Sequence, residues 1–309
     1  MFEPTTEPHG SATLPGDWRQ PPMIEGFFMP EKGRPLHERI EDAVFRRAVD
    51  LLDTGDAEGL RLLLTEHPGL VFQTVTFEGW NYFSNPTLLE FIAENPIRHG
   101  SLPVNITDVA KVILDAGAAA DPSAMDETLG LVCSGRVPRE CGVQVPLIDL
   151  LCGYGAVPES ALPAALAHGE FEAVQALIGK GAPVDLPAAA ALGLDEDSRR
   201  LLPAARAEER HRALALAAQF GHAEVVRLLL DSGEDPNRYN PPGNHGHSTP
   251  LHQAVAGGHL DVVRLLVEHG GASLDLKDTL WEGTPLGWAI HEGQTEIAEY
   301  LRDRLTGKS

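Results

Sequence analysis

Two histidines separated by a single residue, His245 and His247, are the first candidates for chemistry in this sequence. In an extended segment alternate side chains point to the same side, so both imidazoles would face one ligand. Neutral imidazole is a common ligand of zinc and other transition metals. A third ligand would have to come from Glu282 or His291, and no carboxylate stands at a spacing diagnostic of a metal site. The sequence therefore predicts no metal and no other cofactor.

Three arginines, Arg98, Arg136 and Arg139, form a second group in a stretch with few other basic side chains. A guanidinium group binds a carboxylate or a phosphate through paired, charge-assisted hydrogen bonds. If the three groups converge without acidic partners, they predict a site for a small anionic ligand. If they pair with Glu94 or Asp126, they hold the loops that carry them and have a structural role.

A third group combines aromatic, arginine and histidine side chains, the types that contribute most to binding at protein interfaces. It centres on the segment 236–248, with further members before and after it: Arg238, Tyr239, Asn240, His245, His247, Gln219, Phe220, Trp281, Glu282 and His291. Trp80 and Tyr82 belong to another aromatic segment, 71–83, whose alternating residues predict a β-hairpin. We predict that these side chains bind a partner. The alternative is that the polar ones hold together a loop rich in Pro, Gly and Asn.

A pattern that returns along the chain positions these residues. Leu251 is followed seven residues later by Gly258, and the same separation is found in four more pairs: Leu162/Gly169, Leu186/Gly193, Leu214/Gly221 and Leu286/Gly293. Residues 249–254 have the sequence T-P-L-H-Q-A. A period of about 33 residues with a T-P-L-H-x-A signature marks a stacked array of helix pairs. The segment 248–305 and the related segment 211–238 resemble the ankyrin repeat.

The resemblance implies an all-α, ankyrin-like solenoid of stacked helix pairs with short β-hairpin fingers. Residues 1–35, rich in Pro and Gly, are expected to form an irregular N-terminal extension. Residues 36–309 are expected to form a repeat domain of about eight helix pairs, most regular in 211–305. In this family the finger tips and the exposed positions of the inner helices form a concave binding face. The third group of side chains is expected on that face.

Several repeats depart from the family pattern. Long loops at 95–105 and 135–144 occupy equivalent places in adjacent helix pairs, so we expect them to lie side by side and to bring the three arginines together. Only 24 residues separate Leu162 from Leu186, by the difference of their numbers, which indicates that the finger between these two pairs is deleted. The segment 236–248 is by contrast a finger of unusual length.

The residues of the signature have structural explanations. Thr249 is expected to cap a helix with its hydroxyl group, and Pro250 suits the first helical position because no N–H is needed there. Gly258 is expected to end this helix with a positive φ angle, which glycine adopts without steric cost. The histidine of the family motif bonds to nearby backbone and threonine groups, so His252 is expected to be structural rather than catalytic.

Composition narrows the class of partner. The formal net charge of −21 opposes binding to nucleic acid and favours a neutral or basic partner. No apolar run approaches the roughly 20 residues that span a bilayer, and residues 1–20 lack the features of a signal peptide. An odd number of cysteines, three, fits a reducing compartment. We therefore expect a cytoplasmic protein with no membrane partner.

The predicted function is binding of a protein or peptide through the concave face and the fingers. The alternative is a small-molecule-binding or enzymatic derivative of the ankyrin fold. In that case the pocket would be built from four loops: 71–83, 95–105, 135–144 and 236–248. The sequence contains neither a Gly-rich phosphate loop nor a G-x-S-x-G motif, which favours a protein that is not an enzyme.

Overall fold

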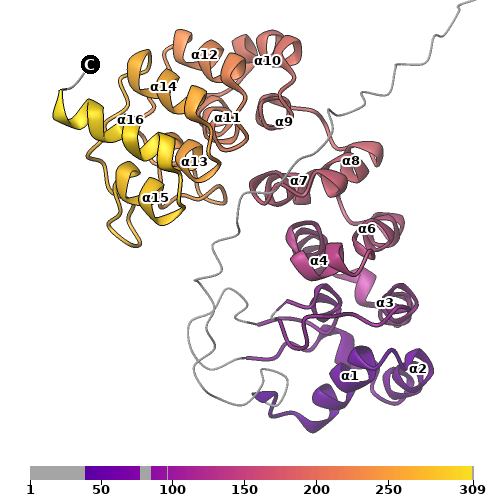
Figure 1. The fold of residues 1–309 in the computed structure, drawn as a ribbon. Coiled ribbons are helices and arrows are strands. Elements are labelled where there is room, and N and C mark those ends of the chain that lie inside the picture. Colours follow the sequence, from indigo (N-terminus) through magenta and orange to yellow (C-terminus); the bar gives the residue numbers. More distant parts are fainter. Residues whose placement is uncertain (1–38, 77–84, 96, 308–309) are drawn as a thin grey trace, which may run out of the picture.

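The computed structural model describes residues 39–76, 85–95 and 97–307, which form a curved array of stacked helix pairs (Figure 1). Each pair consists of a first helix, here called inner, and a second helix, called outer. The inner helices are α1 (Ala43–Asp53), η3 (Leu89–Ala93), α4 (Pro122–Ser134), α7 (Pro158–Ala167), α9 (Leu186–Ala191), α11 (Ala207–Gln219), α13 (Pro250–Ala256) and α15 (Pro285–His291). The outer helices are α2 (Ala57–Glu66), α3 (Ile106–Asp115), α6 (Gln144–Gly153), α8 (Phe171–Gly179), α10 (Asp195–Leu201), α12 (Ala223–Asp231), α14 (Leu260–Glu268) and α16 (Thr295–Thr306). The predicted all-α solenoid is confirmed.

Within the described ranges, short helices lie in four of the connections: η2 (Pro68–Phe72), η4 (Ala118–Ala120), α5 (Arg136–Glu140) and η5 (Leu202–Ala204). Two of them replace predicted irregular or extended structure. The start of the predicted 71–83 hairpin belongs to η2, which begins at a proline, and α5 occupies half of the predicted 135–144 loop. Trp80 and Tyr82 lie outside the described residues.

The fingers also differ from the prediction, since the described part of the chain contains no β-strand. One isolated antiparallel bridge joins Thr74 to Thr87. In the 236–248 finger the Asn240 N–H donates to the Ser248 carbonyl oxygen at 2.8 Å. Three prolines in this finger lack the N–H that a strand ladder needs, which explains why it is an irregular loop.

Side-chain caps fix where the inner helices begin. The Asp121 carboxylate accepts hydrogen bonds from the backbone N–H groups of Ser123 and Ala124 at 3.1 and 3.2 Å. With Pro122 in the first turn, this cap fixes the start of α4. The inner helix of the second pair is the short 3₁₀ helix η3.

His252 has the structural role predicted for it. Its Nε2 lies 3.1 Å from the Gly283 carbonyl oxygen, which can only accept, so Nε2 carries the proton. Its Nδ1 then accepts the hydrogen bond of the Thr249 hydroxyl group at 2.8 Å. The side chain, fully buried, thus joins the start of α13 to the next finger.

Glycines at the ends of the inner helices allow neighbouring pairs to approach closely. The φ angle of Gly258 is +73°, as predicted. A Cβ atom at Gly258 would lie 3.0 Å from Nε2 of Gln294, in the following pair. At Gly221, φ is +78° and a Cβ atom would lie 2.5 Å from Nδ1 of His259. Both positions need glycine for conformation and for space.

The buried apolar side chains form two clusters rather than one continuous core. The first extends from Ile40 to Phe220, and the second extends from Leu186 to Leu301. They meet at α9 and α11, which contribute side chains to both clusters. In Figure 1 the pairs up to α8 and the pairs from α9 onward are stacked in different directions. The border between the two clusters therefore coincides with a bend in the array.

Candidate functional site

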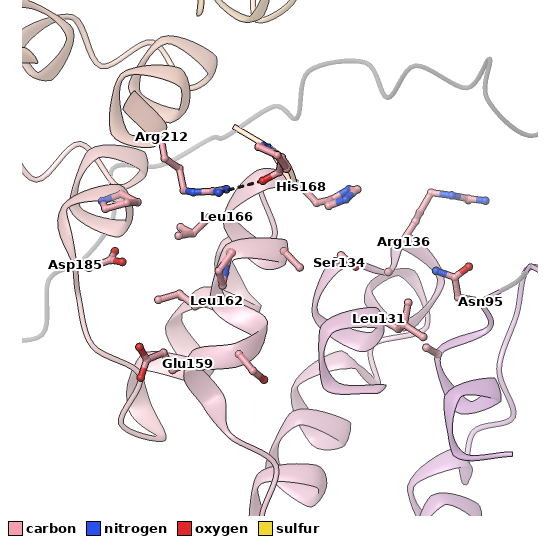
Figure 2. A pocket seen from close by; sticks show the side chains of 18 of the residues that line it. Asn95, Leu131, Ser134, Arg136, Glu159, Leu162, Leu166, His168, Asp185 and Arg212 are labelled. Atoms are coloured by element: carbon pink, nitrogen blue, oxygen red, sulfur yellow. Dashed lines mark hydrogen bonds between the residues drawn. The ribbon is translucent and has the colours of Figure 1, made fainter. Parts of the chain in front are cut away.

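A groove crosses the inner side of the array at this bend (Figure 2). Its volume is ≈ 830 Å³, and its walls come from the residues that follow η3, the end of α4, α5, α7 and the starts of α9 and α11. Pro242 and Gly243, at the tip of the 236–248 finger, also line it. Three of the four loops predicted for a pocket in the alternative interpretation thus contribute: 95–105, 135–144 and 236–248.

The floor of the groove is one face of α7. Leu162 and Leu166, four residues apart, line the groove (Figure 2) and are 3% and 2% exposed. Pro163, between them in the sequence, is exposed. The chain passes from the end of α8 at Gly179 to the start of α9 at Leu186 without a finger. The 24-residue spacing is therefore explained by a short connection, whose Pro183 and Asp185 line the groove.

Two carboxylates without a cationic partner lie in the groove. Glu159 is in the first turn of α7, and Asp185 is the N-cap residue of α9 (Figure 2). The Asp185 Oδ1 accepts a hydrogen bond from the Ala188 N–H at 2.9 Å. Neither carboxylate forms an ion pair within the described ranges. Burial, followed by the charges of Glu209 and Glu159, raises the pKa of the Asp185 carboxyl group.

The arginines of the same wall are already paired. Arg206 lies 2.6 Å from the Glu209 carboxylate. Arg212 donates a hydrogen bond to the Pro242 carbonyl oxygen at 3.0 Å, the dashed line in Figure 2, and its nearest carboxylate, that of Glu208, is 4.0 Å away. Arg212 therefore fixes the tip of the long finger against α11.

Arg98 is not available to a ligand, contrary to its inclusion among the binding residues. Its side chain is 0% exposed and lies 2.7 Å from the Asp53 carboxylate and 2.9 Å from that of Glu94. It also donates to the Phe91 carbonyl oxygen at 2.9 Å. Glu94 accepts the backbone N–H groups of Arg98 and Gly100 at 2.8 and 2.9 Å. Because a buried guanidinium needs such partners, Arg98 holds its own loop together.

The other two arginines also have acidic partners. Arg136, which lines the groove, lies 2.8 Å from Glu140 in the next turn. Arg139 pairs with Glu170, a buried carboxylate. Burial raises the pKa of Glu170 above its usual value, and the charge of Arg139 offsets part of this rise. The prediction that the three arginines converge on a site for an anionic ligand is therefore wrong. The pairing of Arg98 with Glu94 matches the alternative prediction, in which the arginines have a structural role.

The 236–248 finger extends back to α7. His245 has a φ angle of +55°, in the left-handed region, and its Nε2 lies 3.2 Å from the Ala167 carbonyl oxygen at the end of α7. Its ring lies 6.5 Å from that of His168, which lines the groove. The finger thus connects the second apolar cluster to the first.

Gln219 and Phe220 are buried, which corrects the prediction that they lie on the binding face. They are 6% and 8% exposed. The Gln219 Nε2 donates to the Ala167 carbonyl oxygen at 2.9 Å, and the Phe220 ring packs on Phe171 with a centroid separation of 5.1 Å. The end of α11 faces the preceding helix pairs rather than solvent, so both side chains pack between α11 and those pairs.

The interior of the finger contains polar atoms without protein partners. Asn240 is buried, so it cannot form part of an exposed binding face as predicted. Its Oδ1, both amide atoms of Asn244 and the Nε2 of His247 have no hydrogen-bond partner among the residues described. The His247 ring is 5.2 Å from the Trp281 ring. Burial lowers the pKa values of His245 and His247, so both are neutral at neutral pH.

Five of the predicted binding residues are exposed on the fingers and on α15. Tyr239 is 39% exposed and Trp281 46% exposed, and both are large aromatic side chains. Arg238, Glu282 and His291 are exposed as well. The Tyr239 hydroxyl group donates to the Lys277 carbonyl oxygen at 2.7 Å, so neighbouring fingers support each other.

The positions of His245 and His247, the candidate metal ligands, are explained by the packing of the finger. The rings of His245 and His247 are 6.1 Å apart, and the His245 Nε2 is used by Ala167. The Glu282 side chain is 83% exposed and lies 3.7 Å from Lys277. Among the residues described, no group of three or more His, Cys, Asp or Glu side chains is placed to hold a metal ion. In the same ranges, no helix is long and apolar enough to cross a membrane.

Comparison with known proteins assigns the family. A model of ankyrin repeats in three copies matches residues 142–278 and 214–308, which together span more than half of the chain. This chain belongs to the ankyrin repeat family. Cyclin-dependent kinase 4 inhibitor B of Bos taurus is 36% identical over 130 residues, which are 41% of this chain and 95% of the inhibitor. The same inhibitor of Homo sapiens is 34% identical over 128 residues, or 40% and 89% of the two chains.

A longer alignment links the chain to a larger ankyrin repeat protein. Ankyrin repeat and KH domain-containing protein mask-1 of Caenorhabditis elegans is 28% identical over 214 residues. These residues are 63% of this chain and 8% of mask-1. The shared part is therefore a run of ankyrin repeats within a much longer protein.

Sequence reasoning missed the residues that line the centre of the groove. Glu159, Leu166, His168 and Asp185 were not among the predicted site residues, although they lie between the predicted loops in space. The signal was the short distance from Leu162 to the next repeat.

Proposed function

We propose that this ankyrin repeat protein binds an extended segment of another protein in the groove and on the exposed fingers of the C-terminal repeats. The observation that carries the proposal is a single groove lined by five consecutive helix pairs, from η3 to α11. A surface that crosses several repeats suits a polypeptide segment better than a compact small molecule. The names of the similar kinase inhibitors support a protein as partner.

Two fingers contribute exposed aromatic anchors, and the tip of the first of these fingers lines the groove. Tyr239 and Trp281 are held in place by neighbouring fingers, so little side-chain freedom is lost when they contact a partner. Rigid aromatic side chains of this kind dominate binding energy at many interfaces. The net charge of −21 favours a partner that is neutral or basic.

The proposal is tested by selecting peptides from a random display library on the full chain and measuring their affinity for the native chain and two variants. Ala164→Trp places an indole on the α7 face of the groove, and Tyr239→Ala with Trp281→Ala removes the finger anchors. Each variant is expected to weaken binding by about tenfold or more, with an unchanged helical circular dichroism spectrum.

The matched control is Gln175→Trp, which adds the same indole to an exposed position of the outer helix α8. It is expected to leave affinity unchanged. Peptides that bind all four proteins equally would rule out both the groove and the fingers as the binding surface.

A further inference from the structure

The lining of the groove includes exposed apolar side chains from several elements. Ile97, which follows η3, is 55% exposed. Three exposed prolines also line the groove: Pro163 in α7, Pro183 in the connection between α8 and α9, and Pro242 at the tip of the 236–248 finger. Proline rings and aromatic rings are complementary partners in peptide recognition. The groove therefore suits a segment that carries aromatic and other large apolar side chains.

One segment of this chain has the complementary composition. Residues 15–35 lie outside the described ranges, and their three acidic and three basic residues cancel in charge. The rest of the chain thus carries the whole net charge of −21, and a neutral segment is not repelled by it. Five prolines restrict the backbone of the segment, so less conformational freedom is lost on binding. The segment has six large apolar residues: Trp18, Met23, Ile24, Phe27, Phe28 and Met29.

The attachment point of this segment is within reach of the groove. The described structure begins at Arg39, just before α1, and α7 is the inner helix of the fourth pair. Neighbouring pairs are about 10 Å apart, so the three steps from α1 to α7 cover about 30 Å. The 11 residues from Phe28 to Arg39, by the difference of their numbers, span roughly 36–40 Å when extended. Phe28 can therefore reach α7, and earlier residues can extend further along the groove.

We propose that residues 15–35 bind in the groove of the same molecule, with Phe27 and Phe28 packed on the exposed apolar side chains of its lining. The consequence rests on the proposed function, since the segment then competes with a partner peptide for the groove. Tethering gives the segment a high effective concentration, so it competes even when its intrinsic affinity is low. The chain thereby restricts the groove to partners that bind tightly enough to displace the segment.

The position of the segment is tested in the full chain by replacing Phe28 with the photoreactive amino acid p-benzoylphenylalanine. After irradiation, mass spectrometry of the digested monomer is expected to find cross-links to Ile97, to α7 or to the connection 180–185. The same amino acid in place of Phe2, outside the segment, is the control and is expected to give none in the groove. Cross-links from position 28 that are confined to α1 and α2 or to dimers, or equal cross-linking of the groove from position 2, would overturn the inference.

Competition is tested with a peptide obtained by display selection on the full chain. The double replacement Phe27→Ser with Phe28→Ser removes the proposed contacts and is expected to tighten binding of this peptide by about fivefold. Phe2→Ser is the matched control, because it removes an aromatic side chain outside 15–35, and it is expected to change nothing. An unchanged affinity of the double variant would show that the segment does not compete for the groove.

The outcomes separate this inference from the proposed function. If Ala164→Trp weakens peptide binding but position 28 cross-links outside the groove, the proposed function stands and the inference is rejected. If position 28 cross-links to the groove but Ala164→Trp leaves peptide binding unchanged, the groove holds the chain's own segment and the proposed function is rejected.

Discussion

At the scale of single residues, Arg98 and Arg61 show how burial changes the value of an ion pair. The Arg98 side chain is fully buried between two carboxylates, whereas Arg61 pairs with Glu58 at the surface, with both side chains more than half exposed. Water screens the second pair and cannot reach the first. The same residue type therefore has a different role at each position.

We expect Arg98→Met to lower the free energy of unfolding by about 3 kcal/mol, because it leaves the Asp53 and Glu94 carboxylates buried without their cation. Urea unfolding followed by circular dichroism measures the change. Arg61→Met is the control and is expected to have little effect. Equal effects of the two replacements would contradict the structural role of Arg98.

Gly258→Ala is expected to lower the free energy of unfolding by on the order of 1 kcal/mol or more, because φ is +73° and Gln294 lies within 3.0 Å of the new Cβ. Gly287→Ala is the matched control. Gly287 lies within α15, where the added Cβ would be 3.5 Å from the Thr284 hydroxyl oxygen. There alanine is expected to stabilise by roughly 0.5–1 kcal/mol. Equal thermal melting temperatures of the two variants would refute this assignment.

Predictions from the sequence succeeded where a role depends on neighbours along the chain. The helix start at Thr249, the positive φ of Gly258 and the structural role of His252 follow from the order of residues within one repeat. Burial of Arg98 and Gln219 depends on which helix pair lies against each side chain. The position of a neighbouring helix pair cannot be inferred from the order of residues within one repeat. The prediction that Arg98 and Gln219 lie on an exposed binding surface was therefore wrong.

At the scale of elements, the 236–248 finger is fixed to two inner helices, α7 and α11, and is not a free loop. His245 contacts α7, and Arg212 holds Pro242 at the tip. The length of the finger was evident from the 37 residues between Leu214 and Leu251, by the difference of their numbers. Its direction was not, because a loop rich in proline has no hydrogen-bond ladder from which a path can be inferred.

We expect His245→Ala to free the finger without unfolding the array. The replacement removes the hydrogen bond to Ala167 and leaves alanine at a φ angle of +55°. Hydrogen exchange is expected to become faster for the amides of 240–248 and to stay unchanged in α14 and α16. His291→Ala, at an exposed position, is the control. Unchanged hydrogen exchange in the finger would show that His245 does not anchor the finger to α7.

At the scale of the whole molecule, neutral histidines are part of the packing. Burial lowers the pKa values of seven of them below the usual 6.5: His168, His211, His222, His245, His247, His252 and His259. Each side chain binds a proton more readily in the unfolded chain. Their contribution to stability is therefore complete above pH 6.5 and is lost as the pH falls from 6.5 toward the folded-state pKa values.

We expect the urea concentration at the unfolding midpoint to decrease when the pH is lowered from about 7.5 to about 5.5, because the histidines begin to bind protons in the unfolded state. Three carboxyl groups act in the opposite direction, because burial raises the pKa values of Glu90, Glu170 and Asp185. They stabilise the fold as the pH falls toward 4.5 and below. A midpoint that stays constant or rises on acidification from pH 7.5 would show that the histidines do not control stability.

The two apolar clusters make the array a pair of cooperative units with a common border. Each unit can lose its structure while the other keeps its own enclosed core, so thermal unfolding is expected to proceed in two transitions rather than one. A peptide in the groove touches α7, in the first cluster, and also α9 and α11, which contribute to both. Occupancy would then merge the two transitions into one, so that binding is registered as a gain in cooperativity along the whole chain.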